Sequence, residues 1–326
     1  MKDYKVKLVS MGTSTQLPDS QKLFGALVYM FSEKYGNEKA SMLTKALLDK
    51  KIHLALSNVM PLDYLPTPQD YLIDCISEAN NPDTNLKEKR NDIKKRNYIR
   101  LADLEHILKK PENCESVFPY IKLQNRQQLR ASIESDRYDI PELDSKLYSV
   151  PTVDLLEISR DEEGKERKKP VNIFCFYLQA DDSDICADLL DTLDEAASTK
   201  RTVILGKRAS QGLNIFEFQD IIVQGFRHTP ANLFLNIGML LPDEIDFASS
   251  TFKLFTSERR PFEMPGGWDK DFTGYYISFI AEGSIISAPG GLVGAGKSIK
   301  SPFNEKRDIV FGNSFLYPIS LRERRV

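Results

Sequence analysis

The residues with the clearest chemical potential form a glycine-rich run near the C-terminus. Its members are Gly290, Gly291, Gly294, Gly296, Lys297 and Ser298. Glycines expose backbone N–H groups and tolerate positive φ angles, so such a run can curl around an anion. The lysine adds a positive charge and the serine a hydroxyl. The run therefore has the chemistry of a phosphate-binding loop, for a nucleoside triphosphate or for a nucleic-acid backbone.

The first of these ligands is suggested by the pattern G-x-x-x-x-G-K-[ST], which residues 291–298 match. In P-loop proteins this loop follows a buried parallel strand and opens a long helix. Here Pro302 follows closely and disfavours a continuous helix. Little chain remains for the rest of a P-loop domain. The sequence thus favours a nucleic-acid backbone over ATP, and a glycine turn without a ligand stays the alternative.

Composition limits the class of protein. The chain has 326 residues, of which 41% are hydrophobic and 28% charged, which is typical of a globular protein large enough for two domains. Its four cysteines form no CxxC pair, which argues against a zinc site and indicates reduced thiols. No apolar stretch has the length of a membrane span, and the N-terminus does not resemble a signal peptide. We expect a cytoplasmic protein without membrane contact, metal or cofactor.

Charge is segregated along the chain, although the formal net charge is only −3. Acidic residues concentrate between residues 181 and 195. Such segregation permits a basic groove on an acidic molecule, and solvated faces are the simpler alternative. The basic runs contain Lys87, Lys89, Arg90, Lys94, Lys95, Arg96 and Arg100, then Lys165, Arg167, Lys168 and Lys169, and finally Arg322, Arg324 and Arg325.

These residues must be positioned by the surrounding elements, and hydrophobic periodicity indicates a strand–helix unit that occurs twice. The first unit has a strand over 4–9, a helix capped by Asp19 or Ser20 that stops near Gly36, and a second helix from Asn37. The second unit has a strand over 171–178, a helix capped by Ser183 or Asp184, and a strand over 202–205. Further strands are expected over 214–222, 232–240, 252–255, 275–280 and 308–317. This pattern predicts two α+β domains with antiparallel sheets.

The stretch between the two units, residues 80–170, is polar and predicted to be irregular. The segment 161–165 reads as a hairpin tip or a linker. We therefore expect the domain boundary near residue 165.

Three segments, in this order, resemble the CRISPR-associated RAMP superfamily. They are 18–27 (PDSQKLFGAL) after the first strand, 206–212 (GKRASQG) between two later strands, and the late glycine-rich run. Residues 57–62 (SNVMPL) are also similar to a family segment. Within the superfamily, the chain most resembles the subunit of the type III-A (Csm) interference complex that holds the 5′ end of the crRNA.

This resemblance implies a fold of two ferredoxin-like (RRM-like) domains. Residues 1–165 would form the first, with a long polar insertion, and 166–326 the second, with the glycine-rich loop. The implied function is that of a non-catalytic subunit that binds the repeat-derived 5′ tag of the crRNA. The implied partners are the large polymerase-like signature subunit and the backbone RAMP subunit, with target RNA met indirectly.

Binding of an RNA tag requires cations, amide donors and places for unstacked bases. The helix start near Ser20 offers free N–H groups, and the basic segment 94–99 interleaves cations with an aromatic residue. The residues expected to contact RNA are Ser20, Lys22, Lys94, Lys95, Arg96, Lys207, Arg208, Ser210, Gly290, Gly291, Gly294, Gly296 and Lys297.

The alternative is a metal-independent RAMP endoribonuclease that processes repeat RNA by histidine acid–base chemistry. The chain has only His53, His106 and His228. No nucleophile or second acid is paired with any of them in the sequence, so the sequence favours the binding function.

Overall fold

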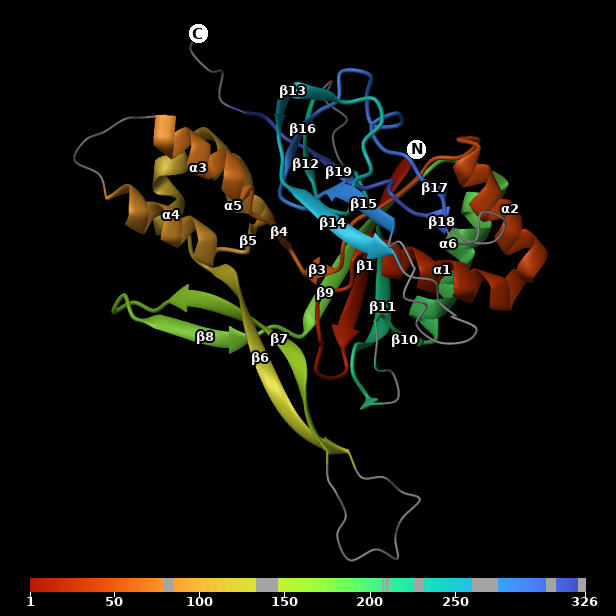
Figure 1. Ribbon diagram of the computed structural model, residues 1–326, viewed down its shortest axis with the longest axis horizontal. Coiled ribbons are helices and arrows are strands. Elements are labelled where there is room, and N and C mark those ends of the chain that lie inside the picture. The colour runs from red at the N-terminus through yellow and green to blue at the C-terminus, as the bar shows by residue number, and fades with distance from the viewer. Residues whose placement is uncertain are drawn as a thin grey trace, which may run out of the picture.

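The computed structural model describes residues 1–78, 85–132, 146–206, 208, 211–225, 232–259, 275–302 and 309–321 (Figure 1). Its central sheet contains neighbouring strands in the order β10-β11-β1-β9-β2, and β3 also pairs with β9. All of these pairings are antiparallel. The strands are β1 (Lys2–Ser10), β2 (Leu54–Leu56), β3 (Met60–Pro61), β9 (Ile173–Ala180), β10 (Thr202–Ile204) and β11 (Ile215–Gln224).

Helices α1 (Ser20–Tyr35), α2 (Asn37–Leu48) and α6 (Asp184–Ser198) lie together beside this sheet, on the right of Figure 1. The cap of α1 is Asp19, whose Oδ1 accepts a hydrogen bond from the Lys22 backbone N–H at 2.9 Å. The helix ends where Gly36 adopts a φ of +88°, which favours glycine. The predicted helices and the central strands are therefore confirmed, with boundaries shifted by a few residues.

A second sheet has the strand order β13-β16-β12-β19, again with antiparallel neighbours. Its strands are β12 (Leu233–Asn236), β13 (Asp246–Thr251), β16 (Ile285–Ser287) and β19 (Leu316–Pro318). The first strand of this sheet in the chain, β12, thus lies between the fourth, β19, and the third, β16. The second strand, β13, lies at the edge. The central sheet arranges β1, β2, β9 and β11 in the same way.

The connections of the second sheet differ from those of the first. A two-stranded ribbon of β14 (Leu254–Arg259) and β15 (Tyr275–Ile280) lies between β13 and β16 in the chain. The glycine-rich run and the pair β17 (Ile299–Lys300) and β18 (Ile309–Val310) lie between β16 and β19. In the central sheet the corresponding connection, from β9 to β11, contains helix α6 and the short strand β10.

A third sheet, β4-β5-β6-β7-β8, belongs to a long insertion between β3 and β9, on the left of Figure 1. The prediction that residues 80–170 are irregular is wrong for the described part, which forms two long paired strands and several helices. Polarity there reflects exposure of the ribbon rather than absence of structure. The elements are β4 (Tyr64–Pro66), α3 (Gln69–Glu78), α4 (Leu86–Lys95), β5 (Tyr98–Arg100), α5 (Leu101–Lys109), a 3₁₀ turn (Pro111–Ser116), β6 (Tyr120–Ser132), β7 (Lys146–Arg160) and β8 (Glu166–Pro170).

The predicted boundary near residue 165 lies in the turn between β7 and β8, where the Gly164 N–H donates to the Asp161 carbonyl at 2.9 Å. The hairpin tip predicted for this segment is confirmed. The division into 1–165 and 166–326 does not separate two sheets, because β1 lies between β9 and β11 and pairs with both. A sheet built from both sides of residue 165 cannot be split there without exposing the edges of its central strand.

A large hydrophobic cluster extends across the central, inserted and second sheets. The rings of Phe24 on α1 and Phe311, just after β18, stack with centroids 4.4 Å apart. Tyr177 on β9 and Phe315 before β19 have centroids 5.5 Å apart. The central sheet and the C-terminal segment are thus packed against each other. No helix in the described ranges is long and apolar enough to cross a membrane.

A glycine after β12 provides a test of this packing. A Cβ atom on Gly238 would lie 2.6 Å from the Leu56 carbonyl oxygen and 2.7 Å from Ser314 Oγ. Gly238→Ala must shift backbone as well as a side chain, so we expect a loss of about 1–3 kcal/mol of folding stability, measured as a lower thermal midpoint. Gly25→Ala is the matched control, because no atom lies within 4 Å of its added Cβ and the site is in helix α1. Its midpoint should stay equal or rise; equal losses in both variants would contradict this packing.

Candidate nucleic-acid interface

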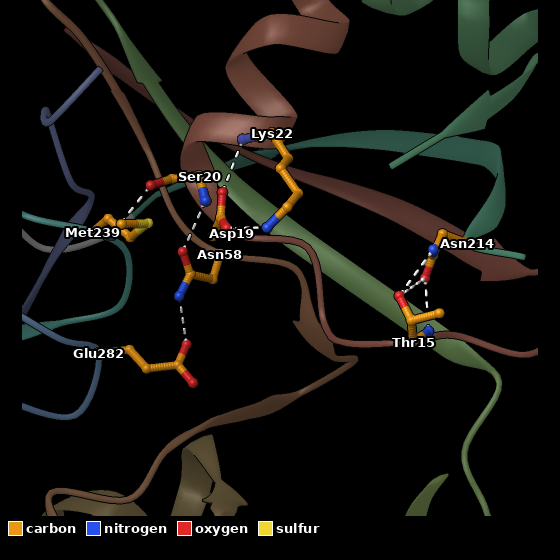
Figure 2. A network of polar contacts seen from close by, with 8 residues as sticks. All are labelled: Thr15, Asp19, Ser20, Lys22, Asn58, Asn214, Met239 and Glu282. Carbon is orange, nitrogen blue, oxygen red and sulfur yellow. Dashed lines mark hydrogen bonds and ion pairs between the residues drawn. The ribbon is translucent and has the colours of Figure 1, made fainter. Parts of the chain in front are cut away.

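The start of α1 is joined to the second sheet by a chain of polar contacts (Figure 2). The Ser20 backbone N–H donates to Asn58 Oδ1 at 2.8 Å, and Ser20 Oγ accepts from the Met239 N–H at 3.1 Å. Ser20 is fully buried, and Lys22 Nζ pairs with Asp19 in the preceding turn. The sequence predicted an RNA-facing Ser20 at a free helix start. The structure corrects the position of this side chain, which faces protein.

Glu282 extends the same network to the third sheet. Its carboxylate accepts from Asn58 Nδ2 at 2.7 Å and from the Tyr98 hydroxyl at 2.9 Å. Burial raises the pKa of the Glu282 carboxyl, and the two donors only partly offset this rise. Tyr98 lies on β5 of the inserted sheet. The start of α1, the second sheet and the inserted sheet are therefore all joined at this one acid.

The basic segment at the end of α4 divides into exposed and enclosed cations. Lys94 is exposed, and Lys95 Nζ pairs with Asp92 at 2.9 Å. Arg96 is only 3% exposed, and its guanidinium donates to the carbonyls of Asp92 and Glu115 at 2.8 and 2.6 Å. The guanidinium also lies 4.4 Å from the ring centroid of Tyr120. Arg96 was predicted at an RNA-binding surface; its position is corrected to the interior, where it supports the 3₁₀ turn and β6.

The glycine-rich run packs along residues 241–244 instead of opening a helix. The N–H groups of Asp243 and Glu244 donate to the carbonyls of Ala295 and Gly294 at 3.1 and 2.9 Å. The short strand β17 follows, which agrees with the prediction that this is not a P-loop. Gly291 has a φ of +89°, and Gly290 lies exposed in the turn before it.

Two glycines of the run permit close packing. An added Cβ would lie 2.6 Å from Glu244 Oε2 at Gly294, and 2.8 Å from Leu240 Cδ1 at Gly296. The predicted cation is also partnered within the chain, because Lys297 Nζ lies 3.0 Å from Asp243 Oδ1. Lys50 lies 2.5 Å from the other oxygen of this carboxylate. An RNA phosphate at this loop would have to compete with Asp243 for Lys297.

The mid-chain basic loop is anchored at its ends. Asn214 is buried with a φ of +61°, and its Oδ1 accepts from the Thr15 N–H at 2.8 Å (Figure 2). A Cβ on Gly206 would lie 2.9 Å from Asn214 Nδ2, so only glycine fits opposite this amide. Arg208 is exposed beside the inserted hairpin, whereas Lys207 and Ser210 lie outside the described residues.

The structure adds residues to this loop that sequence reasoning missed. Arg130 on β6 and Tyr148 on β7 contact Gln211, which also receives a hydrogen bond from Arg208. Sequence reasoning did not include Arg130 and Tyr148 because the segment that forms their hairpin was predicted to be irregular. The predicted site residues are therefore not gathered at one place. The loop that carries Arg208 contacts Arg130 and Tyr148 of the inserted hairpin through Gln211.

Of the described histidines, His53 is hydrogen bonded within the fold. His53 Nε2 lies 2.7 Å from Gln179 Oε1, and burial lowers the pKa of its imidazole. His106 lies on helix α5, as predicted, and His228 lies outside the described residues. In the described part of the chain, no group of three or more His, Cys, Asp or Glu side chains is placed to hold a metal ion.

Comparison with known proteins places the fold. No protein-family model matches the chain, and no curated protein matches it in sequence. The solved structures do match. One chain of the crystal structure of the Csm1–Csm4 cassette in complex with cA4 is similar with a TM-score of 0.57 and 16% identity, over 99% of this chain and 100% of that chain.

A second match is a chain of the Csm3–Csm4 subcomplex in the type III-A CRISPR–Cas interference complex. It has a TM-score of 0.51 and 14% identity, over 98% of this chain and 100% of that chain. These likenesses show that the chain shares its mixed α/β fold, with antiparallel sheets, with one chain of each of these two structures. The resemblance predicted from three short motifs is thereby confirmed for the fold of the whole chain.

The shared carboxylate beneath the glycine-rich run gives a pH-dependent prediction. Hydrogen bonds and charge from Lys50 and then Lys297 lower the pKa of Asp243 from its ordinary value of 3.8. A lowered folded-state pKa contributes stability that is present above pH 3.8 and lost as pH falls through the folded value. Asp243→Asn should therefore lower stability at pH 7 by about 1 kcal/mol. The deficit should shrink as pH falls below 3.8, as measured by urea unfolding.

The double variant Lys50→Gln/Lys297→Gln is the matched control for this prediction, because it removes the same ion pairs from the other side. It should reproduce the loss at pH 7. A deficit of Asp243→Asn that is equal at pH 7 and pH 2 would show that packing, not ionisation, is responsible.

Proposed function

We propose that this chain is a non-catalytic crRNA-binding subunit of a type III-A CRISPR interference complex. It holds the repeat-derived 5′ tag and bridges the large signature subunit to the backbone filament. The observation that carries the proposal is the fold shared over nearly the whole chain with components of a Csm1–Csm4 cassette and of a Csm3–Csm4 subcomplex. One of those assemblies pairs Csm4 with Csm1 and the other pairs it with Csm3, as expected for a bridging subunit.

The finer architecture supports this proposal. We infer two ferredoxin-like units, because both main sheets have the strand order in which the first strand lies between the fourth and the third. The first unit comprises β1, α1, β2, β9, α6 and β11, with the third sheet as an insertion. The second comprises β12, β13, β16 and β19, with loops and ribbons in the places of helices. On this interpretation the boundary between units follows β11, later than residue 165.

The distribution of cations is consistent with a protein that grips a strand rather than cleaves it. The exposed Arg208, the partly exposed Lys297 and the glycine-rich run offer charge and backbone amides. The described histidines offer no acid–base pair, since His53 is held against Gln179 and its lowered pKa keeps it neutral at pH 7. We therefore infer a binding protein of the cytoplasm, without a cofactor.

Expression with its neighbouring subunits tests the function. Tagged chain should copurify with the large signature subunit, the backbone subunit and a guide RNA whose 5′ end begins with repeat sequence. Sequencing of the bound RNA and mass spectrometry of the particle give the measurement. Recovery of the chain alone, without RNA or either subunit from cells that express all of them, would count decisively against the proposal.

The endoribonuclease alternative makes a different prediction. The purified chain should leave labelled repeat RNA intact in EDTA, because no described histidine is paired with a second catalytic group. Gel analysis over several hours gives the measurement, with His53→Gln and His228→Gln as matched variants. Site-specific cleavage by the wild type that either substitution abolishes would favour the enzyme.

A further inference from the structure

Two arginines from distant parts of the chain share one hydrogen-bond acceptor. Arg130 Nη1 on β6 donates to Gln211 Oε1 at 3.1 Å, and Arg208 Nη1 donates to the same oxygen at 3.5 Å. The amide nitrogen of Gln211 donates in turn to the Tyr148 hydroxyl on β7 at 3.4 Å. One neutral side chain therefore lies between two guanidinium groups and next to an aromatic ring.

Among the residues that the structure describes, this pair of guanidinium groups has no anionic partner. Two groups that contact one oxygen lie on the order of 6 Å apart, where like charges repel. Among the described residues, neither Arg130 nor Arg208 has an ion pair with a carboxylate. Other arginines do: Arg126 Nε lies 2.8 Å from Asp154 Oδ2, and Arg201 pairs with Glu33.

An anion with several acceptor oxygens would supply the partner that the described surroundings of the two arginines lack. A guanidinium presents donors in a planar fork that matches carboxylate or phosphate. Arg130 has only neutral amide acceptors among the described residues: Gln211 Oε1 for Nη1, and Gln128 Oε1 for Nε and Nη2 at 3.2 and 3.0 Å. A phosphate between Arg130 and Arg208 would accept from both groups and neutralise their repulsion. Gln211 occupies this place in the free chain and can swing aside, because it is partly exposed.

The backbone holds Arg208 in place for this contact. Its φ is +68°, a left-handed conformation that is uncommon for residues with a side chain and concentrates at functional sites. The loop is fixed by Asn214, whose side chain binds Thr15, and by the close approach of Gly206 to Asn214. The cation is thus presented by an anchored loop, whereas Arg130 comes from the paired strands of the hairpin.

Tyr148 adds an aromatic surface to the two cations. The Arg208 guanidinium carbon lies 6.0 Å from the centroid of its ring, and the ring is partly exposed. Single-stranded RNA is held by this combination, since cations track the phosphates and aromatic rings stack on the bases. In Figure 1 the connection after β10 and the described ends of β6 and β7 lie at the same lower edge of the molecule.

We propose that Arg130 and Arg208 jointly bind one backbone phosphate of a single-stranded RNA, displacing Gln211, and that Tyr148 stacks on an adjacent base. This inference rests on the proposed RNA-binding function and names a particular contact for it. It adds Arg130, Gln211 and Tyr148 to the residues expected from the sequence. It also gives the inserted hairpin a part in holding the strand.

The test is a phosphate scan on the purified full-length chain. The probes are labelled single-stranded RNAs of the repeat-derived 5′ sequence, each with one phosphate replaced by a neutral methylphosphonate. Arg130→Gln and Arg208→Gln should each weaken binding of the unmodified RNA about tenfold and lower the log–log salt slope by roughly 0.7. One methylphosphonate position should weaken the wild type and have no further effect on either variant.

Arg126→Gln is the matched control, because Arg126 lies on the same strand but pairs with Asp154. It should bind the RNA series as the wild type does. Tyr148→Leu should lose about tenfold in affinity while Tyr148→Phe keeps it, since stacking needs the ring and not the hydroxyl. The thermal midpoints of both Arg→Gln variants should match that of the wild type, which separates loss of binding from loss of folding.

Three outcomes separate this inference from the proposed function. Wild-type affinity in both Arg→Gln variants would overturn the inference and leave the function standing. The inference would also be overturned if Arg130→Gln and Arg208→Gln became insensitive to methylphosphonates at two different positions, because each arginine would then contact its own phosphate. A wild-type chain that binds none of the RNAs, alone or with its partner subunits, would remove the proposed function and the inference together.

Discussion

The arrangement of the whole chain depends on the backbone hydrogen bonds along both edges of β1. This strand begins at Lys2, yet its partners β9 and β11 lie far along the sequence. A central strand leaves no backbone donors or acceptors for solvent, and its alternate side chains, such as Val6 and Leu8, are fully buried. Between β1 and β9 the chain adds β2 and β3 beside β9, then leaves the central sheet to form the inserted sheet and returns as β9. The inserted sheet, with its long hairpin, therefore starts and ends at strands that contact β9 or are β9 itself.

The buried carboxylate of Glu282 joins distant parts of the chain through side-chain hydrogen bonds, as β1 does through backbone hydrogen bonds. It joins Asn58, which holds the start of α1, to Tyr98 of the inserted sheet. A buried acid is costly unless its oxygens are hydrogen bonded, and here both oxygens accept. The network fixes the relative position of the three sheets with few groups. At the start of α1, the N–H groups of Ser20 and Lys22 donate to Asn58 and Asp19, so these two groups are not available to an anion.

Electrostatic pairing distinguishes structural cations from those available to a ligand. Lys22, Lys34, Lys297 and Arg126 have carboxylate partners, and Arg96 is enclosed by carbonyls and aromatic rings. Pairing lowers the attraction that these groups can offer to a phosphate, because a carboxylate must be released first. The arginines that share Gln211 have no such competitor among the described residues. Proximity in sequence to a basic run is thus a weaker guide to RNA binding than the identity of each cation's neighbours.

The sequence by itself determined the local elements and the class of fold. The Asp19 cap, the stop at Gly36 and the alternation of β1 are local signals, since they depend on residues a few positions apart. Three motifs in order were sufficient to indicate the RAMP resemblance. Only the tertiary structure decided where Ser20 and Arg96 point, that β1 joins strands from both halves, and that Arg130 meets Arg208. These facts arise from contacts between residues far apart in the chain, and neither periodicity nor composition encodes which distant partners will meet.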